Sequence, residues 1–305
     1  MKFTKTSYLL FPAFCLFTLS GIAQTVPGKM VLSKGQKIVI NNDVQIAGSQ
    51  EAMGQTIDIT STAKTAHEVL VKDKKPGSYI LSTTLTKVSS SFEGMGMTKT
   101  FDSDKKEDME GEEGKLFKDQ LNVSEDTEYD QSGRVISTDK KDTAVAGANP
   151  MMDMIKKMSG PSGPASAAFL VIPSGKKVGD TWSDSLVYEG SKIYTEYNFK
   201  ALNGNIAIVT STGKQSTNMK TEQQGMEMTV RVEATIASEG TVDISNGLIQ
   251  QKTSTVNGTT NTEVMGQTIP GTTKVTTTTT VTKPDLFMHL SKGVVFIKWR
   301  LFYVL

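Results

Sequence analysis

Polar and apolar residues alternate along most of this chain, the pattern of strands that bury one face. The alternating runs are rich in Val, Ile, Thr, Tyr and Phe, residue types that favour extended structure. Strand-helix alternation is missing, which argues against a nucleotide-binding α/β sheet. The predicted strands include residues 38–40, 57–60, 69–71, 79–88, 193–199, 206–210, 228–236, 248–256 and 272–282.

Turn signals separate these runs. Glycine tolerates the positive φ angles that tight hairpin turns demand, and Asn, Pro and Ser favour the neighbouring turn positions. The sequence therefore predicts a series of long antiparallel hairpins. The signals are Pro76-Gly77, Ser132-Gly133, Asn203-Gly204-Asn205, Asn246-Gly247, Asn257-Gly258 and Pro270-Gly271.

Two stretches depart from the strand pattern. Residues 102–113 are dominated by Asp and Glu and predict a solvated loop or a loose helix entry. Residues 150–158 place Met151, Met154, Ile155 and Met158 on one face of a short helix. A Gly/Pro/Ser/Ala-rich linker follows near the middle of the chain.

The stretches before and after this helix resemble each other. Residues 129–136 and residues 242–249 each read strand, Asp, a turn containing Gly, and strand. Such repetition indicates duplicated supersecondary units. We therefore predict a mainly β fold: two related antiparallel β-sheet halves, built of long hairpins in a curved sheet or half-barrel, with a short Met-rich helix between them. The expected divisions are a signal peptide at 1–23, an N-terminal β half at 24–147, the helix and linker at 148–168, a C-terminal β half at 169–283 and an apolar tail at 284–305.

The start of the second half carries a family resemblance. Residues 172–182 contain Pro173 and the run Val178-Gly179-Asp180-Thr181-Trp182. This segment resembles one in an exported all-β bacterial protein family of unknown function, and more distantly the layout is similar to periplasmic half-barrels that carry lipids or lipoproteins. The resemblance implies an all-β module and assigns no catalytic residue.

A short phrase that begins with methionine and ends with threonine recurs four times. The copies are Met53-Gly54-Gln55-Thr56, Met95-Gly96-Met97-Thr98, Met226-Glu227-Met228-Thr229 and Met265-Gly266-Gln267-Thr268. Methionine fills irregular apolar gaps and also lines adaptable binding surfaces, and soft thioethers select Cu(I). Core packing, a ligand or partner surface, and a metal site are therefore all open at this stage. If the phrases are hairpin tips at one end of a curved sheet, they form an apolar rim suited to ligand binding. The candidate ligand-binding residues are Met53, Met95, Met97, Met226, Met228 and Met265.

The first 23 residues have the features of a secretory signal peptide. Lys2 and Lys5 precede an apolar run, and residues 21–23 form a small-x-small cleavage site. Cleavage removes Cys15, the chain's one cysteine, so no disulfide is expected. We predict an exported protein, periplasmic or extracellular, without a transmembrane helix after cleavage. With 33 basic and 32 acidic residues, the chain also lacks the basic excess that nucleic-acid binding needs.

Catalytic chemistry has little support in the sequence. His67 and His289 are the two histidines; His67 lies in an alternating strand, where an exposed or cross-strand role is expected. No Gly-x-Ser-x-Gly elbow occurs, and the acidic stretches lack the spacing of an EF-type calcium loop. We therefore predict neither enzyme activity, nor a cofactor, nor a bound metal.

The tail after Pro284 has two interpretations: a closing or docking strand, or a segment foreign to the fold.

The function predicted from sequence is a non-enzymatic cell-envelope protein that binds or carries an apolar ligand or lipid. The alternative is a structural module that contacts another envelope protein without a small ligand.

Overall fold

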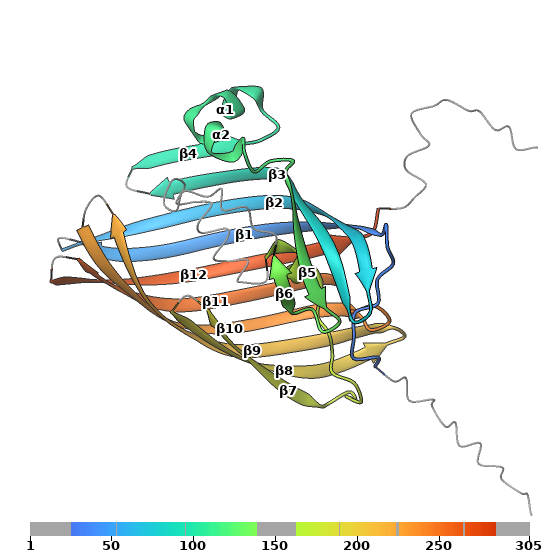
Figure 1. Cartoon of the computed structure of the whole chain (residues 1–305). Helices are drawn as coiled ribbons and strands as arrows, with labels where there is room; N and C mark the ends of the chain where they lie inside the picture. Colours follow the sequence, from blue (N-terminus) through green and yellow to red (C-terminus); the bar gives the residue numbers. More distant parts are fainter. Residues whose placement is uncertain are drawn as a thin grey trace, which may run out of the picture.

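The computed structural model describes residues 26–52, 54–94, 96–138, 163–188, 190–223, 226–264 and 266–284. Within these ranges twelve strands form one antiparallel, curved sheet (Figure 1). The predicted signal peptide, the Met-rich helix at 150–158 and the tail from residue 285 lie outside the described residues. The strands are β1 Lys37–Ala52, β2 Gln55–Lys75, β3 Ser78–Gly94, β4 Met97–Asp102, β5 Ser124–Asp130, β6 Val135–Thr138, β7 Thr181–Tyr188, β8 Ser191–Asn203, β9 Ile206–Gln223, β10 Met226–Asp243, β11 Leu248–Val264 and β12 Gln267–Thr282.

The strand order joins the two halves of the sequence at the middle of the sheet. It runs β6-β5-β3-β2-β1-β12-β11-β10-β9-β8-β7, with β4 paired to β3 beyond the end of β5. The β1–β12 pair is the seam between the halves, with Val39 opposite Thr282 and Gln50 opposite Gly271. The predicted mainly β, antiparallel, curved fold is confirmed.

Three short helical elements accompany the sheet. α1 (Lys106–Glu110) and α2 (Glu112–Phe117) lie between β4 and β5, in the acidic stretch. Phe117 of α2 is buried and stacks on Phe101 of β4 with ring centroids 4.7 Å apart. The 3-10 helix η1 (Pro164–Ala168) begins the second half.

Two predicted turns lie inside strands instead, and that prediction is wrong. Asn257-Gly258 is in β11, opposite Thr235 and Ala234 of β10. Pro270-Gly271 is in β12, and Pro270 lies one residue beyond the last β1–β12 pair, a position where a missing N–H costs little. The glycines are needed for close approach: a Cβ on Gly271 would lie 2.9 Å from the Ser49 carbonyl oxygen. Strand glycines of this kind permit tight bending of a sheet.

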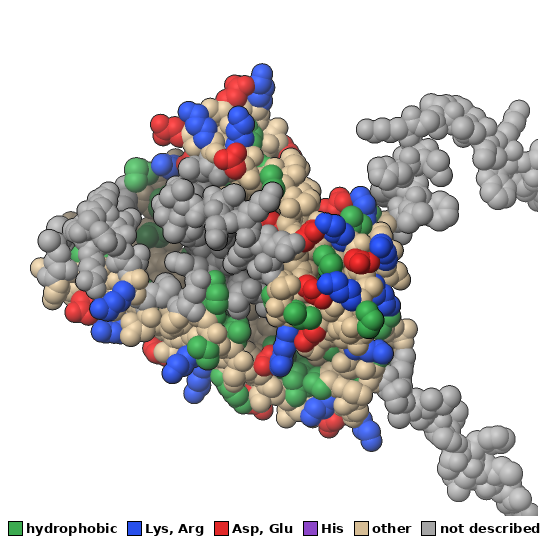
Figure 2. All heavy atoms as spheres, viewed as in Figure 1, with side chains coloured by type: hydrophobic (Ala, Val, Ile, Leu, Met, Phe, Trp, Pro, Cys, Tyr) green, Lys and Arg blue, Asp and Glu red, His purple; other side chains and the backbone are tan. Residues whose placement is uncertain are grey.

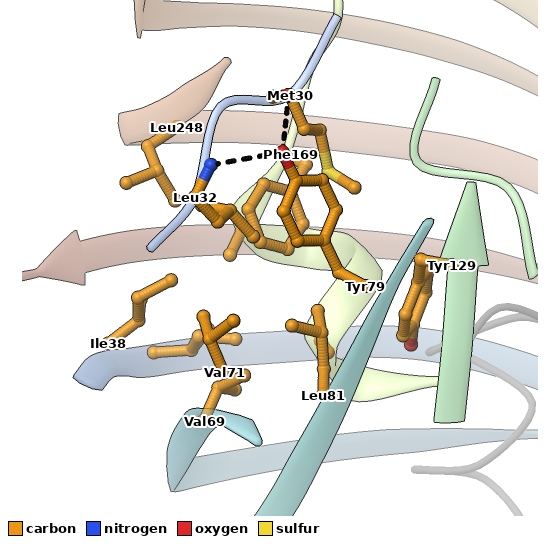
Figure 3. Packing of buried hydrophobic residues seen from close by; sticks show 13 residues of the cluster. Met30, Leu32, Ile38, Val69, Val71, Tyr79, Leu81, Tyr129, Phe169 and Leu248 are labelled. Atoms are coloured by element: carbon orange, nitrogen blue, oxygen red, sulfur yellow. Dashed lines mark hydrogen bonds between the residues drawn. The ribbon is translucent and has the colours of Figure 1, made fainter. Parts of the chain in front are cut away.

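A packed core closes one end of the sheet, which we call the closed end. Residues 26–36 and 163–172 cross the sheet there and cover the buried side chains of β1, β2 and β3 (Figure 3). The Tyr79 hydroxyl ties one crossing segment down: it donates to the Met30 carbonyl oxygen at 3.1 Å and accepts from the Leu32 N–H at 3.3 Å. The closing core consists of Met30, Leu32, Ile38, Ile40, Val69, Val71, Tyr79, Leu81, Tyr129, Ala165, Ala168, Phe169 and Leu248.

The two predicted Asp turns hold the same crossing segment from both halves. Asp130 Oδ1 accepts from the Ser132 N–H at 2.8 Å, and Asp243 Oδ1 accepts from the Ser245 N–H at 3.0 Å. Backbone carbonyl groups of these turns accept hydrogen bonds from the crossing segment at residues 26–36. The Met30 N–H donates to Gln131 O, and the Val31 N–H donates to Asn246 O. The repeated sequence motif therefore builds a clamp at the closed end.

Candidate functional site on the concave face

The two faces of the sheet differ in chemistry. On the outer face, charged side chains form cross-strand ion pairs, such as Lys37 with Glu68 at 2.8 Å and Lys200 with Glu239 at 2.8 Å. The concave face is the one that carries the closing core. Beyond that core, the described inward positions of β1, β12, β11, β10 and β9 carry a single charged side chain, whereas charged side chains gather over α1 and α2 (Figure 2). This concave surface is the candidate site.

Aliphatic side chains line the middle of the concave face. The strand register places them directly side by side on β1, β12, β11 and β10, and all are half-buried. The β-branched type suits a pleated surface, and half-burial leaves apolar area available to another molecule. We call this set the aliphatic row: Ile46, Val275, Val256 and Ile236.

A row of polar side chains crosses the same strands nearer the closed end. The Thr279 hydroxyl donates to Asn42 Oδ1 at 2.8 Å, and Asn42 Nδ2 donates to the Thr65 hydroxyl at 3.4 Å. Lys252 of β11 is the direct register partner of Thr279 and completes the row. We call Thr65, Asn42, Thr279 and Lys252 the polar row.

Lys252 is unusual in its surroundings. By register, it is the one Lys, Arg, Asp or Glu at the concave positions of β1, β12, β11, β10 and β9, counted over the described residues. On β2, Lys74 shares the core side with Tyr79 at the closed end. It makes no ion pair or hydrogen bond with any other residue that the structure describes. Burial lowers the pKa of the Lys252 ammonium because the charged form loses hydration there.

A glycine makes room for this lysine. Gly240 of β10 is the other register partner of Lys252. A Cβ added at Gly240 would lie 3.3 Å from Lys252 Cβ and 3.4 Å from Lys252 Cγ. The missing side chain therefore leaves space for the aliphatic part of Lys252 to lie along the concave face.

His67 lies beside the polar row and is buried. It is two residues from Thr65 on β2, on the same face, and only 4 % of its surface is exposed. Its Nδ1 has no hydrogen-bond partner in the described part of the chain. Burial lowers the pKa of His67 to about 4, so the imidazole is neutral at neutral pH. Of the exposed or cross-strand roles expected for His67, the exposed one is wrong: the imidazole is buried and neutral, opposite Ile40 of β1.

Three of the methionine phrases fall at hairpin turns, and the one at residues 226–229 begins β10 directly after a turn. The turns follow β1, β3, β9 and β11, which run in the same direction in the antiparallel order, so all four lie at the end opposite the closing core. We call this the tip end. Gly54, Gly96 and Gly266 occupy three of the turns with φ between +71° and +76°, which explains the glycine of the phrase.

The six methionines named from sequence are only partly placed. Met97 begins β4 and is 51 % exposed, Met228 lies half-buried on the concave face of β10, and Met226 begins β10 opposite Gln223. Met53, Met95 and Met265 lie outside the described residues, as do the methionines of the predicted helix. Ligand binding by these six residues stays a prediction.

Outside the concave face, the described residues offer little support for a metal site, a membrane-spanning helix or an enclosed pocket. The described residues hold no group of three His, Cys, Asp or Glu side chains placed to share a metal ion. In the same ranges, none of the helices has the length and apolar character required to cross a bilayer. A hollow of about 390 Å³ lies over Gly258 and is bordered by outer-face residues including Lys214, Glu233 and Asn257, but it is shallow and open.

Sequence reasoning missed the polar row. Asn42 lies outside the predicted strands, whereas Lys252 and Thr279 lie inside the predicted strands 248–256 and 272–282. The register that brings these polar residues together is not contained in the sequence pattern of any one strand. One signal was present: Lys252 has the same strand parity as Val256, four residues along, which predicts a lysine on the apolar face.

Similarity to solved structures supports the fold. A lipovitellin structure, described by its title as showing lipid-protein interactions, is similar with a TM-score of 0.51 and 12 % identity. The match covers 83 % of this chain and 26 % of the lipovitellin chain, so this protein spans about a quarter of that one's length. The COG4313 outer membrane channel from Pseudomonas putida F1 matches with 8 % identity over 83 % of this chain and 98 % of its own. Its TM-score of 0.22 is too low to indicate a shared fold.

Sequence comparison reaches only part of the chain. No curated protein sequence matches it. A family model matches residues 166–249, a segment that contains residues 172–182 and the second Asp turn. The resemblance noted from sequence to a family of unknown function is therefore confirmed over this segment. The matching family is DUF6263, a family of unknown function.

Proposed function

We propose that this protein binds or carries an apolar ligand on the concave face of its sheet, as a non-enzymatic exported protein of the cell envelope. The observation that carries the proposal is the aliphatic row, four half-buried aliphatic side chains aligned across adjacent strands beyond the closing core. When a ligand covers such half-buried apolar surface and removes it from water, the binding free energy becomes more favourable by about 25 cal/mol per Å².

Two further features support the proposal. The hairpin turns of the tip end lie at or beside copies of the methionine phrase, and methionine suits adaptable apolar contacts. The similar structure with the TM-score of 0.51 is a protein whose title names lipid-protein interactions. Export rests on the N-terminal sequence features.

The test is ligand uptake by the purified full chain. A fluorescent fatty acid should bind and gain emission, and native mass spectrometry should detect co-purifying apolar molecules. Ile236→Asn, which places an amide in the aliphatic row, should weaken binding at least about tenfold, equivalent to 1.4 kcal/mol. Ala237→Asn, the next residue on the exposed outer face, is the matched control and should bind like the wild type. Absence of any uptake or co-purifying molecule contradicts the proposal.

A second function has one specific observation in its favour. β7 is an edge strand, and near it Val187 is 73 % exposed and Tyr194 48 % exposed. An apolar sheet edge can pair with a strand of another protein. Such an edge would suit a structural module that contacts another envelope protein. A Val187→Lys variant that no longer binds such a protein but keeps ligand uptake would favour this second function.

A further inference from the structure

The polar row lies where the head of an apolar ligand would end. It crosses the concave face between the closing core and the aliphatic row, so a chain entering from the tip end meets it last. Lys252 and Gly258 are six residues apart on β11, about 20 Å at the usual rise per residue of a strand. That length accommodates a long acyl chain that runs along the strands and crosses the aliphatic row on its way to the tip end.

We propose that the polar row is the headgroup site of a long-chain carboxylate. The Lys252 ammonium would pair with the carboxylate while the acyl chain runs toward the tip end. This deepens the proposed function, on which it rests, by naming the ligand as a single-chain anionic amphiphile.

The charge of Lys252 is the main support. Charged side chains are rarely buried without a partner, because burial removes their hydration. On the outer face, Lys37 and Lys200 reach cross-strand carboxylates, whereas Lys252 reaches no described carboxylate. Gly240 moreover leaves room for the Lys252 stem. A cation that has no partner among the described residues, on strands β1, β12, β11, β10 and β9 whose other described concave positions are uncharged, is suited to an anion supplied by a ligand.

The neighbouring groups supply neutral donors. Thr279 uses its hydroxyl hydrogen on Asn42 Oδ1, and Asn42 uses one amide hydrogen on Thr65. One Asn42 amide hydrogen and the Thr65 hydroxyl hydrogen are left by these two bonds as donors. One cation with neutral donors matches a singly charged carboxylate better than a doubly charged phosphate, whose second charge would remain uncompensated in a partly desolvated place.

The test compares two probes that differ only in the head: hexadecanoate and hexadecanol, each titrated into the full chain below its aggregation limit. The wild type should bind hexadecanoate at least about tenfold more tightly, the 1.4 kcal/mol of one charge-assisted contact. Lys252→Gln should abolish this preference by weakening hexadecanoate alone. Lys252→Met, which keeps the length without the amide, should give the same result if the glutamine variant folds poorly.

The matched control is Lys214→Gln, an exposed lysine on the outer face of β9, which should keep the wild-type preference. Equal wild-type affinity for the two probes, or a preference that survives at position 252 without lysine, overturns the headgroup site while leaving the apolar-ligand proposal intact. Failure of both probes to bind the wild type overturns both proposals.

Discussion

The same strands behave differently at their two ends. At the closed end, Val69 and Val71 of β2 are fully buried beneath residues 26–36 and 163–172. At the tip end, Ile57 and Ile59 of the same strand and face are half-buried. Burial of large side chains under the crossing segments stabilises the fold, whereas the half-buried aliphatic surface contributes less to folding and remains available for binding. The molecule thus separates a stabilising end from a candidate binding end on one continuous sheet.

The largest predicted effect is on the closing core. Leu81→Ala should lower the free energy of unfolding by about 2–5 kcal/mol, because Leu81 is fully buried and its loss leaves a cavity. Val256→Ala, in the half-buried aliphatic row, should cost about 1 kcal/mol or less. Urea denaturation followed by circular dichroism measures both. Equal costs would remove the distinction between the two ends.

The next effect is acid sensitivity through His67. Its pKa is about 4 in the folded protein and near 6.5 in the unfolded chain, so below pH 6.5 the unfolded chain binds the extra proton. Stability from this group is full above pH 6.5 and is lost as the pH falls toward 4, by about 2 kcal/mol between pH 7 and 5.

His67→Leu should flatten this part of the stability profile, as measured by urea denaturation at several pH values. Carboxyl groups such as Asp73, whose pKa the Lys34 hydrogen bond lowers, act at lower pH and should leave the pH 5–7 window unchanged. An unchanged slope in His67→Leu would show that the imidazole is not buried as described.

A smaller effect concerns the tie across the closing core. Tyr79→Phe removes the hydroxyl that bridges the Met30 carbonyl oxygen and the Leu32 N–H, leaving both without that partner. We expect a loss of about 1–3 kcal/mol and faster amide hydrogen exchange in residues 26–36. The tip-end hairpins should exchange as in the wild type, and a uniform acceleration over the whole sheet would contradict a local tie.

The smallest predicted effect has the opposite sign. Lys252→Met should raise the free energy of unfolding by about 1 kcal/mol, because it removes a charge that burial disfavours. Lys214→Met, on the outer face, should change it by less than about 0.5 kcal/mol. Thermal unfolding without ligand compares the two variants. Destabilisation by Lys252→Met would indicate a structural role for the lysine instead of a binding one.

The sequence predicted the closed end better than the tip end. Large apolar residues are concentrated in residues 38–40 and 69–71 and recur through residues 79–88, and these segments lie in β1, β2 and β3 as expected. The two Asp turns were also recognisable, because an Asp side chain capping a Gly-containing turn has a local signature. Local chemistry and a packed core determine these features.

The tip end was harder to predict because its inward residues are small or polar. Residues 61–64 lie between the predicted strand 57–60 and the alternating segment around His67, yet all belong to β2, with Ser61 and Ala63 facing inward. Gly258 and Gly271 resemble turn residues but serve close strand approach and bending. The pairing of Lys252 with Thr279 depends on register between strands, which no single-strand pattern contains.

The most direct test of the central claim is to locate a bound alkyl chain. A hexadecanoate carrying a photoreactive diazirine at its methyl end can be irradiated in the complex and mapped by peptide mass spectrometry. We predict labels on inward-facing residues of β1, β10, β11 and β12 between the aliphatic row and the tip end, with Ile236→Asn reducing them. Labels confined to the closed end, the outer face or the β7 edge would contradict a binding surface on the concave face.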